Sequence, residues 1–433
     1  MRKNYFAIFS ICLLFLFFNM SLSAQSGESE TSLNSELKEL LKSRNFQKLK
    51  HYIDQHHAEI SPSEFYYYKS HIDMAFFKGD SSNFYADQLL QNPGTFLNDS
   101  IKLEMLDVKS TNYIRDFEYK KAAEILDYIL KNFTHLSDSA EIENYANVYA
   151  LFKTIENVPP QVIEKKHDVS IPSHRNQFNH LITPVKCNKV KTDFIFDTGA
   201  SLSVVSEKFA AMMGLKIFES NINVGTATHI DVVTKLAVAD SFYVGGILFK
   251  NVVFLVTPDN QMTYPSINYT INGIIGFPVI YQMEEVRMNK NGSLFIPKET
   301  HQKQLHNMFF DGLNPVVQVI SENDSLWFTL DTGARMSSLS KKYYDAHTEK
   351  VKNEGKLQIS QRGGAAGIVE EEEYLLYDFP YKIGSEENTL PEIPVRLNTY
   401  SFNKHFDGNL GQDVMKQFDV MILNFEDMYV DFE

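Results

Sequence analysis

Hydrophobic residues in the first third of the chain recur three and four positions apart, which is the spacing of a helix that buries one face. The first such run predicts a helical hairpin and comprises Leu37, Leu40, Leu41, Phe46, Leu49, Tyr52 and Ile53. The pattern continues over residues 65–77, 83–90, 101–114, 117–133 and 142–155, with few glycines in between. We therefore predict an all-α domain of helical hairpins over residues 30–157.

Several segments of this helical domain look alike, which suggests a repeat. The predicted turns often begin with Asn-Phe or Asp-Phe, at Asn45-Phe46, Asn83-Phe84 and Asp116-Phe117. Residues 119–126 resemble the second helix of a tetratricopeptide-type repeat, and an irregular helical bundle remains an open alternative. Three roles stay open for the domain: a docking array for substrates or a partner, a pro-segment that covers a cleft, or a purely stabilising domain.

The helical pattern ends at Asn157-Val158-Pro159-Pro160, because the two prolines cannot continue a helix. Residues 158–174 mix acidic and basic side chains and are predicted to be a linker. From about Phe178 onward, apolar and β-branched residues occur in short runs separated by glycine and polar residues, which is typical of strands. We therefore predict that the rest of the chain is mainly β.

Two of these apolar runs end in the same four residues, Asp-Thr-Gly-Ala. The two copies are Asp197, Thr198, Gly199, Ala200 and Asp331, Thr332, Gly333, Ala334. Two carboxylates about 3 Å apart can share one proton, so that one acts as a base while the other acts as an acid. Glycine has no Cβ and lets two such loops approach closely, whereas a buried threonine hydroxyl must find a hydrogen-bond partner. The pattern therefore predicts an acid–base pair of aspartates.

One copy of the motif on its own would be ambiguous. A single Asp-Thr-Gly is a good turn sequence, and related loops bind phosphate in actin-like ATPases or carry the phosphorylated aspartate of ion-pumping ATPases. The first class needs alternating strands and helices with nucleotide-binding loops, and the second needs many membrane spans. The sequence has neither pattern, so the repetition of the motif favours the paired aspartates.

A second landmark follows each copy of the motif, Ile274-Ile275-Gly276 in the first and Asn409-Leu410-Gly411 in the second. Asp331 follows Asp197 by 134 residues, and Gly411 follows Gly276 by 135. The alignment continues downstream and pairs Val279 with Val414, Gln282 with Gln417, Val286 with Met421, Met288 with Leu423, and Asn289 with Asn424. The sequence therefore contains an internal duplication of one small domain.

On these residues, the chain from 175 to 433 resembles a bacterial retropepsin-like aspartic peptidase, a relative of pepsin and of the viral retropepsins. The resemblance implies a bilobal acid-protease β-barrel fold, with lobes at 175–300 and 301–433. It implies that Asp197 and Asp331 are catalytic, that Gly276 and Gly411 brace their loops, and that an extended polypeptide is the substrate. No cofactor or metal is required. The second lobe departs from the family pattern at Asn409.

Each lobe should carry a hairpin between its aspartate and its bracing glycine, and such a hairpin folds over the substrate in this family. The candidates are residues 223–228, with Gly225 and Thr226, and residues 361–367, with Gly363 and Gly364. Glycines make both tips mobile, as a lid must be. Neither tip contains a tyrosine, so the hairpins look more like viral flaps than like the pepsin flap. Ordinary connecting hairpins remain the alternative.

The N-terminus predicts export from the cytoplasm. Arg2 and Lys3 precede an apolar stretch over residues 6–18 and small residues up to Ala24, as in a secretory signal peptide of residues 1–24. We expect a periplasmic or secreted protein without a membrane span after signal removal, and an uncleaved anchor stays possible. The mature chain would keep Cys187 as its single cysteine, so it would contain no intrachain disulfide.

Charge and composition exclude several other classes of function. The net charge is −14, and it becomes −16 without the predicted signal, which disfavours nucleic-acid binding. The 13 histidines form no His-Glu-x-x-His motif, so a metallopeptidase is disfavoured. The main alternative to an aspartic endopeptidase is a catalytically silent secreted protein that binds peptides and carries a helical-repeat arm.

The residue after each glycine adds an expectation about pH. Many aspartic peptidases have Ser or Thr there, whose hydroxyl donates to the carboxylate and lowers its pKa. Ala200 and Ala334 cannot do so. We therefore expect a pH optimum closer to neutral than that of pepsin-like enzymes.

Overall fold

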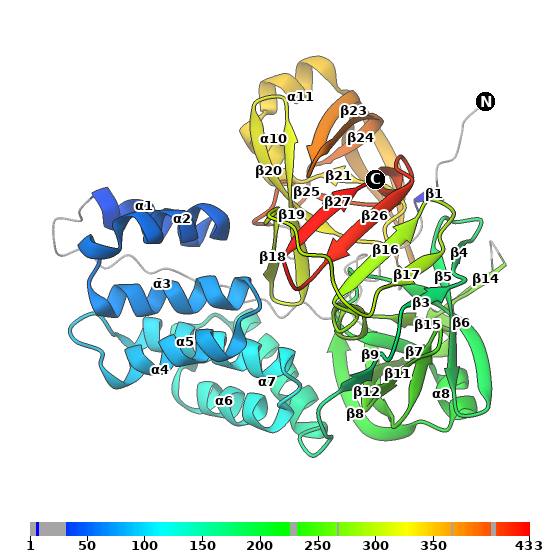
Figure 1. Cartoon of the computed structure of the whole chain (residues 1–433), viewed down its shortest axis with the longest axis horizontal. Helices are drawn as coiled ribbons and strands as arrows, with labels where there is room; N and C mark the ends of the chain where they lie inside the picture. The colour runs from blue at the N-terminus through cyan, green and yellow to red at the C-terminus, as the bar shows by residue number, and fades with distance from the viewer. Residues whose placement is uncertain (1–5, 8–31, 226–231, 266–267, 365–366, 400–403) are drawn as a thin grey trace. The chain divides into compact units, whose positions relative to one another are not determined.

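The computed structural model describes residues 6–7, 32–225, 232–265, 268–364, 367–399 and 404–433. The chain divides into two compact units. The colour in Figure 1 follows the residue number from blue at the N-terminus to red at the C-terminus. A helical unit extends to Pro160 and also includes Phe309–Gly312, and a β unit contains Gln161–Met308 and Leu313–Glu433. The expected fold class, a mainly β acid-protease fold preceded by helices, is confirmed.

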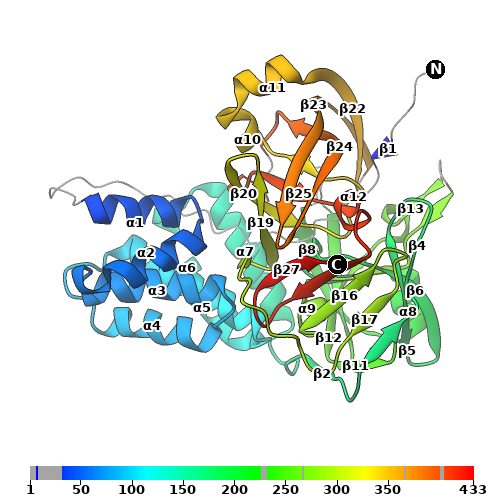
Figure 2. The ribbon, with the colours of Figure 1, turned by 45° about the horizontal axis from the view of Figure 1, so that its top comes forward.

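The helical unit consists of successive antiparallel helices, as Figures 1 and 2 show. They are α1 (Ser32–Lys42), α2 (Phe46–His56), α3 (Pro62–Ala75), α4 (Gly79–Gln91), α5 (Asp99–Arg115), α6 (Tyr119–Asn132) and α7 (Ser139–Thr154). The turns α1–α2, α3–α4 and α5–α6 each place one residue in the left-handed region: Arg44, Phe77 and Phe117, at φ of 56°, 58° and 59°. Three hairpins thus share one turn conformation, although none of these residues is glycine.

The segment predicted to be a linker, residues 158–174, is largely built into the β unit. It carries β2 (Val162–Glu164), which pairs with β11 (Ile247–Lys250), and β3 (Val169–Ile171), which pairs with β17 (Leu294–Ile296). The alternating buried, exposed, buried pattern of β3 was too short to stand out in the sequence. Backbone pairing with distant strands therefore orders residues 158–174, which the composition of the sequence predicts to be a linker.

The first lobe is a highly curved sheet in the order β2-β11-β10-β5-β6-β15-β7-β12-β9-β8, with β4 beside β5. Its remaining elements are β4 (His174–Arg175), β5 (Leu181–Cys187), β6 (Val190–Phe196), β7 (Ser203–Ser206), α8 (Glu207–Met213), β8 (Lys216–Val224), β9 (Val232–Ala239), β10 (Phe242–Val244), β12 (Val252–Thr257), β13 (Thr263–Tyr264), β14 (Tyr269–Thr270), β15 (Gly273–Ile275) and α9 (Phe277–Tyr281). Cys187 is buried in this lobe.

The second lobe repeats this plan with the order β22-β23-β24-β21-β25-β20-β19. Its elements are β18 (Met308–Asp311), β19 (Asn314–Ser321), β20 (Asp324–Leu330), β21 (Ser338–Leu339), α10 (Lys341–Ala346), α11 (Thr348–Glu354), β22 (Lys356–Gly364), β23 (Gly367–Ile383), β24 (Glu386–Arg396), β25 (Gly408–Leu410) and α12 (Gln412–Met415). The strand β20 and the short β25 hold the same positions as β6 and β15 of the first lobe.

A separate sheet joins the lobes in the order β27-β26-β16-β17-β3. Its central strands are β16 (Glu285–Asn289) and β26 (Val420–Asn424), which pair antiparallel, while β27 (Tyr429–Phe432) lies outside β26. The sequence duplication aligns β16 with β26, so two copies of one strand pair with each other. Such pairing about a local two-fold axis is what two fused, related lobes require.

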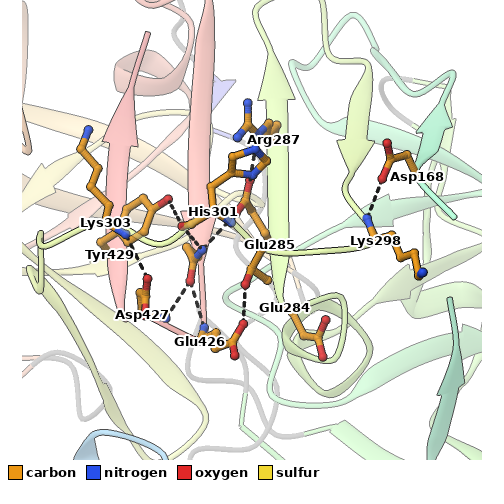
Figure 3. A network of polar contacts seen from close by, with 12 residues as sticks. Asp168, Glu284, Glu285, Arg287, Lys298, His301, Lys303, Glu426, Asp427 and Tyr429 are labelled. Atoms are coloured by element: carbon orange, nitrogen blue, oxygen red, sulfur yellow. Dashed lines mark hydrogen bonds and ion pairs between the residues drawn. The ribbon is translucent and has the colours of Figure 1, made fainter. Parts of the chain in front are cut away.

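The connection between the lobes is held against this sheet by the polar network of Figure 3. Glu285, which is fully buried, accepts hydrogen bonds from the backbone N–H of His301 (2.6 Å) and from Asn424 Nδ2 (3.0 Å). Tyr429 Oη donates to the carbonyl of His301 at 2.9 Å. A buried carboxylate with several donors is stable without water, and here it fixes the path of the interlobe connection.

The predicted signal peptide, residues 1–24, lies outside the described residues except for β1 (Phe6–Ala7), which pairs with β22. Within the part of the chain that is described, no helix is long and apolar enough to cross a membrane.

Candidate active site

The two Asp-Thr-Gly-Ala loops begin where a central strand of each lobe ends. Asp197 follows β6 and Asp331 follows β20, and both strands lie inside their sheets with apolar residues leading into the loop. The backbone N–H of Asp197 donates to Ile275 O (3.1 Å), and that of Asp331 donates to Leu410 O (3.0 Å). The strand that precedes each bracing glycine therefore fixes each aspartate at its backbone.

The threonines of the two loops hold each other in place. Thr198 N donates to Thr332 Oγ1 at 2.9 Å, and Thr332 N donates to Thr198 Oγ1 at 3.0 Å. Each hydroxyl also donates to a carbonyl of the opposite lobe, Leu330 O for Thr198 (2.8 Å) and Phe196 O for Thr332 (2.9 Å). Both side chains are fully buried. Four reciprocal hydrogen bonds thus lock the loops across the junction.

Gly199 and Gly333 are required by the close approach of the loops. A Cβ on Gly199 would lie 2.7 Å from Asp331 Cγ, and one on Gly333 would lie 2.5 Å from Asp197 Cγ. Real Cβ atoms do not tolerate such distances, so any side chain would push the carboxyl groups apart. The two glycines therefore allow the aspartates to meet.

The carboxyl groups of Asp197 and Asp331 lie within hydrogen-bonding reach of each other, and both residues are only 3% exposed. Burial, followed by the adjacent Asp331 charge, raises the pKa of Asp197 well above its ordinary value. Like charges at such a distance cannot both ionise readily in a buried site. The arrangement therefore favours a single proton shared by the two carboxyl groups.

The backbone hydrogen bonds to the two carboxylates differ. Asp331 Oδ1 accepts from the N–H groups of both Gly333 and Ala334, each at 2.9 Å. Asp197 Oδ1 accepts from Gly199 N at 2.9 Å, and the backbone N–H of Gly333 also acts on Asp197 and lowers its pKa. Hydrogen bonds to a carboxylate favour its charged form. The additional donor from Ala334 thus favours the negative charge on Asp331.

The bracing glycines pack against the chain that leaves each loop. A Cβ on Gly276 would lie 2.6 Å from Ser203 N, and one on Gly411 would lie 2.6 Å from the carbonyl carbon of Met336. Their N–H groups donate to Ser203 Oγ (3.1 Å) and Ser337 Oγ (2.9 Å). Sequence reasoning missed these serines. They are separated by 134 residues, the same distance that separates Asp197 from Asp331, so an alignment of the two duplicated halves would have paired them.

Asn409, which departs from the family pattern, has a specific partner. Thr329 Oγ1 donates to Asn409 Oδ1 at 2.6 Å, inside the β20–β25 pair. The corresponding pair in the first lobe is Ile195 and Ile274. A polar pair thus replaces an apolar pair at the same position, so the departure at Asn409 leaves the bracing strand intact.

Both predicted flap segments begin at the ends of paired strands. Strands β8 and β9 pair up to Val224 and Val232, so Gly225 follows the end of β8, whereas Thr226 lies outside the described residues. Gly363 and Gly364 are the last residues of β22, and Gly364 pairs with Gly367 of β23. The hairpins exist, and their function as flaps stays a prediction.

Metal ligands are not clustered in the described parts of the chain, where no group of three or more His, Cys, Asp or Glu side chains could hold an ion.

Comparison with known proteins supports a peptidase. Residues 183–279 match the family described as aspartyl protease, and they contain Asp197 and Gly276. No curated protein matches the chain. Among solved structures, the chain resembles Basic 7S globulin from soybean at 7% identity and a TM-score of 0.39, over 63% of this chain and 95% of that chain. Residues 183–279 thus match an aspartyl protease family, and a helical region precedes them in the chain.

The buried pair predicts an unusual response of stability to pH. A carboxyl group whose pKa is raised by folding stabilises the folded state below its unfolded pKa, and this contribution is lost as the pH rises through its folded pKa. Asp331→Asn removes the like charge next to Asp197, so we expect the melting temperature to rise at pH 8. The gain should be a few degrees, on the order of the 2–4 °C that 1 kcal/mol produces in a domain of 150–250 residues.

Calorimetry or circular dichroism at pH 3 and pH 8 measures this effect. The pKa of Asp197 is raised well above its ordinary value, so Asp197 is protonated near pH 3, the like-charge repulsion is absent and the gain should almost vanish. Asp193→Asn is a matched control, because Asp193 is exposed on the same strand that leads to Asp197. An equal gain at both pH values would contradict the buried, like-charged pair.

Proposed function

We propose that the chain is an aspartic endopeptidase that hydrolyses peptide bonds of extended polypeptides through Asp197 and Asp331. The observation that supports this most strongly is the contact between two buried carboxyl groups from duplicated loops. The reciprocal threonine bonds and the match to the aspartyl protease family add to it.

The proposed mechanism is general acid–base catalysis without a covalent intermediate. A water molecule lies between the two carboxyl groups. The ionised carboxylate accepts a proton from this water as its oxygen attacks the peptide carbonyl, and the protonated carboxyl donates to the carbonyl oxygen. The loops cannot shift easily, because the threonines and glycines fix them. This preorganisation keeps the carboxyl groups in the geometry that the transition state needs.

The substrate is proposed to lie extended, with its backbone next to the flap strands β8–β9 and β22–β23 and its alternate side chains in pockets. We further propose export to the periplasm or beyond, and a role for the helical unit in docking a protein partner or substrate. The shared turns of its three hairpins support a repeat array, which commonly provides an extended binding surface.

The test is incubation of the full mature chain with a diverse peptide pool from pH 3 to 8, followed by mass spectrometry of the products. We expect internal cleavage with an optimum above about pH 3, because Ala200 and Ala334 lack the hydroxyl that lowers the carboxyl pKa in many relatives. A chelator should leave the rate unchanged. An optimum below about pH 3 would contradict the argument from the alanines.

The alternative is a secreted protein that binds peptides without cutting them. Absence of cleavage at every pH, together with retention of peptides from the pool on the immobilised chain, would favour it. Both aspartates are present and in contact, which supports the enzyme over the binding protein.

A further inference from the structure

A chain of hydrogen bonds leads from the first lobe to the catalytic loop of the second lobe. Arg175, in β4, donates from Nη1 to Oε1 of Gln412, and Gln412 donates from Nε2 to the carbonyl of Thr332. The same peptide group carries the N–H of Gly333, which donates to Asp331 Oδ1 at 2.9 Å. Three hydrogen bonds and one peptide group therefore connect a guanidinium to a catalytic carboxylate.

Hydrogen bonds in such a series strengthen one another. A donor on the carbonyl side of a peptide group polarises it and makes its N–H a better donor. Gln412 is fully buried, and burial lowers the pKa of Arg175 to about 10 without removing its charge at neutral pH. The charge of Arg175 therefore acts on Asp331 through a polarised and rigid path.

The aligned position of the first half-site carries a side chain that cannot form this link. The duplication aligns Gln412 with Phe277, and the backbone contact is the same in both lobes: Phe277 N donates to Ala200 O (2.8 Å), and Gln412 N donates to Ala334 O (2.9 Å). The phenylalanine side chain has no hydrogen-bond donor and stacks on Tyr281. Only the side chain differs between these two matched positions, and the difference provides a polar path to Asp331.

Further charges gather around the second loop. Burial and then the neighbouring Arg175 lower the pKa of Lys416, which also senses Asp413 and Arg335. Asp413 accepts from Ser337 N and Oγ, at 2.8 and 2.7 Å. At the aligned positions, the first lobe has Ser201 in place of Arg335 and Tyr281 in place of Lys416. Asp197 therefore acts on Asp331, and a group of charges lies next to α12, with the cations Arg175, Arg335 and Lys416 and the carboxylate of Asp413.

We propose that Arg175, acting through Gln412, is a positioning residue that places the negative charge on Asp331 and leaves the shared proton on Asp197. Asp331 then accepts the proton of the attacking water, and Asp197 donates to the carbonyl oxygen of the substrate. This assignment rests on the proposed peptidase function. The hydrogen bond from Ala334 to Asp331 favours the same distribution of charge.

The first test is the pH dependence of kcat/KM for one cleaved peptide. Arg175→Met should move the acidic limb to higher pH by roughly half a unit, less than the 1–3 units of a direct charge pair. It should lower kcat more than it changes KM. Arg175→Lys keeps a positive charge, so its acidic limb should lie near that of the parent chain. Gln412→Met should move the acidic limb to higher pH although Arg175 is present.

Arg287→Met is the matched control, because Arg287 Nε donates to Glu285 Oε1 (2.8 Å) in the interlobe sheet rather than towards a catalytic loop. It should leave the limb in place. An Arg175→Met variant with a lower rate and an unmoved acidic limb would show a merely structural role and overturn the proposal.

A second test does not depend on activity. The gain in melting temperature from Asp331→Asn at neutral pH is compared in the parent chain and in the Arg175→Met background. Loss of the cation makes the buried Asp331 carboxylate less favourable, so the gain should be larger by about 2 °C in the second background. Equal gains would overturn the proposal. If the gain in melting temperature were larger in the Arg175→Met background but the chain cleaved no peptide, the effect of Arg175 on Asp331 would stand and the peptidase function would be rejected.

Discussion

Replacing either aspartate of the pair by asparagine is expected to lower kcat/KM for peptide cleavage by at least about 10³-fold, within the range that loss of a general acid or base produces. Asp331→Asn removes the base in the proposed assignment, and Asp197→Asn removes the acid. An amide can neither accept the proton of the attacking water nor donate one as a carboxylic acid does. The two variants should therefore be almost equally inactive, because each group is useless without the other.

The experiment needs proof that the variants remain folded. Asparagine has nearly the shape of aspartate, so the four threonine bonds between the loops should persist, and the melting temperature should not fall. Asp193→Asn again serves as control, since it removes a carboxylate four residues before Asp197 at an exposed position. Cleavage at the wild-type rate by both dyad variants would reject the catalytic role of the pair.

Much of this site could be read from the sequence, because the duplication acts as an internal alignment. Two Asp-Thr-Gly-Ala motifs and two bracing glycines at matched distances define two equivalent half-sites. The close contacts at Gly199 and Gly333 then follow from the absence of a Cβ. Motifs that depend on local backbone geometry can be recognised in a single sequence, because a glycine marks a position where a side chain would not fit.

Other features depend on partners that lie far away in the chain. Arg175 and Gln412 are separated by 237 positions, and neither belongs to a motif. Asn409 looked like a defect until its partner Thr329 was seen on the neighbouring strand. The strands β2 and β3 were hidden in a predicted linker, because three paired residues leave no periodicity. Pairing between distant segments is set by the tertiary fold, which a single sequence does not display.

The threonine lock provides the second large effect, on stability rather than on chemistry. Thr332→Val keeps the shape of the side chain but leaves two buried groups without their partner, the N–H of Thr198 and the carbonyl of Phe196. An unsatisfied buried polar group costs about 1–3 kcal/mol, so the free energy of unfolding should fall by about 2–6 kcal/mol. Thr198→Val should act similarly through the N–H of Thr332 and the carbonyl of Leu330.

Thr257→Val is the matched control for this prediction. Thr257 is also buried in a strand of the β unit, at 3% exposure, and its hydroxyl has no hydrogen-bond partner among the described residues. The same substitution there removes a buried polar atom that contributes no bond, so it should be neutral or slightly stabilising. Urea unfolding of the three variants measures the difference directly. Threonine does not titrate, so the loss for Thr332→Val should be the same at pH 4 and pH 8, unlike the pH-dependent gain for Asp331→Asn. If Thr332→Val were as stable as Thr257→Val, the reciprocal hydrogen bonds would not be what holds the two half-sites together.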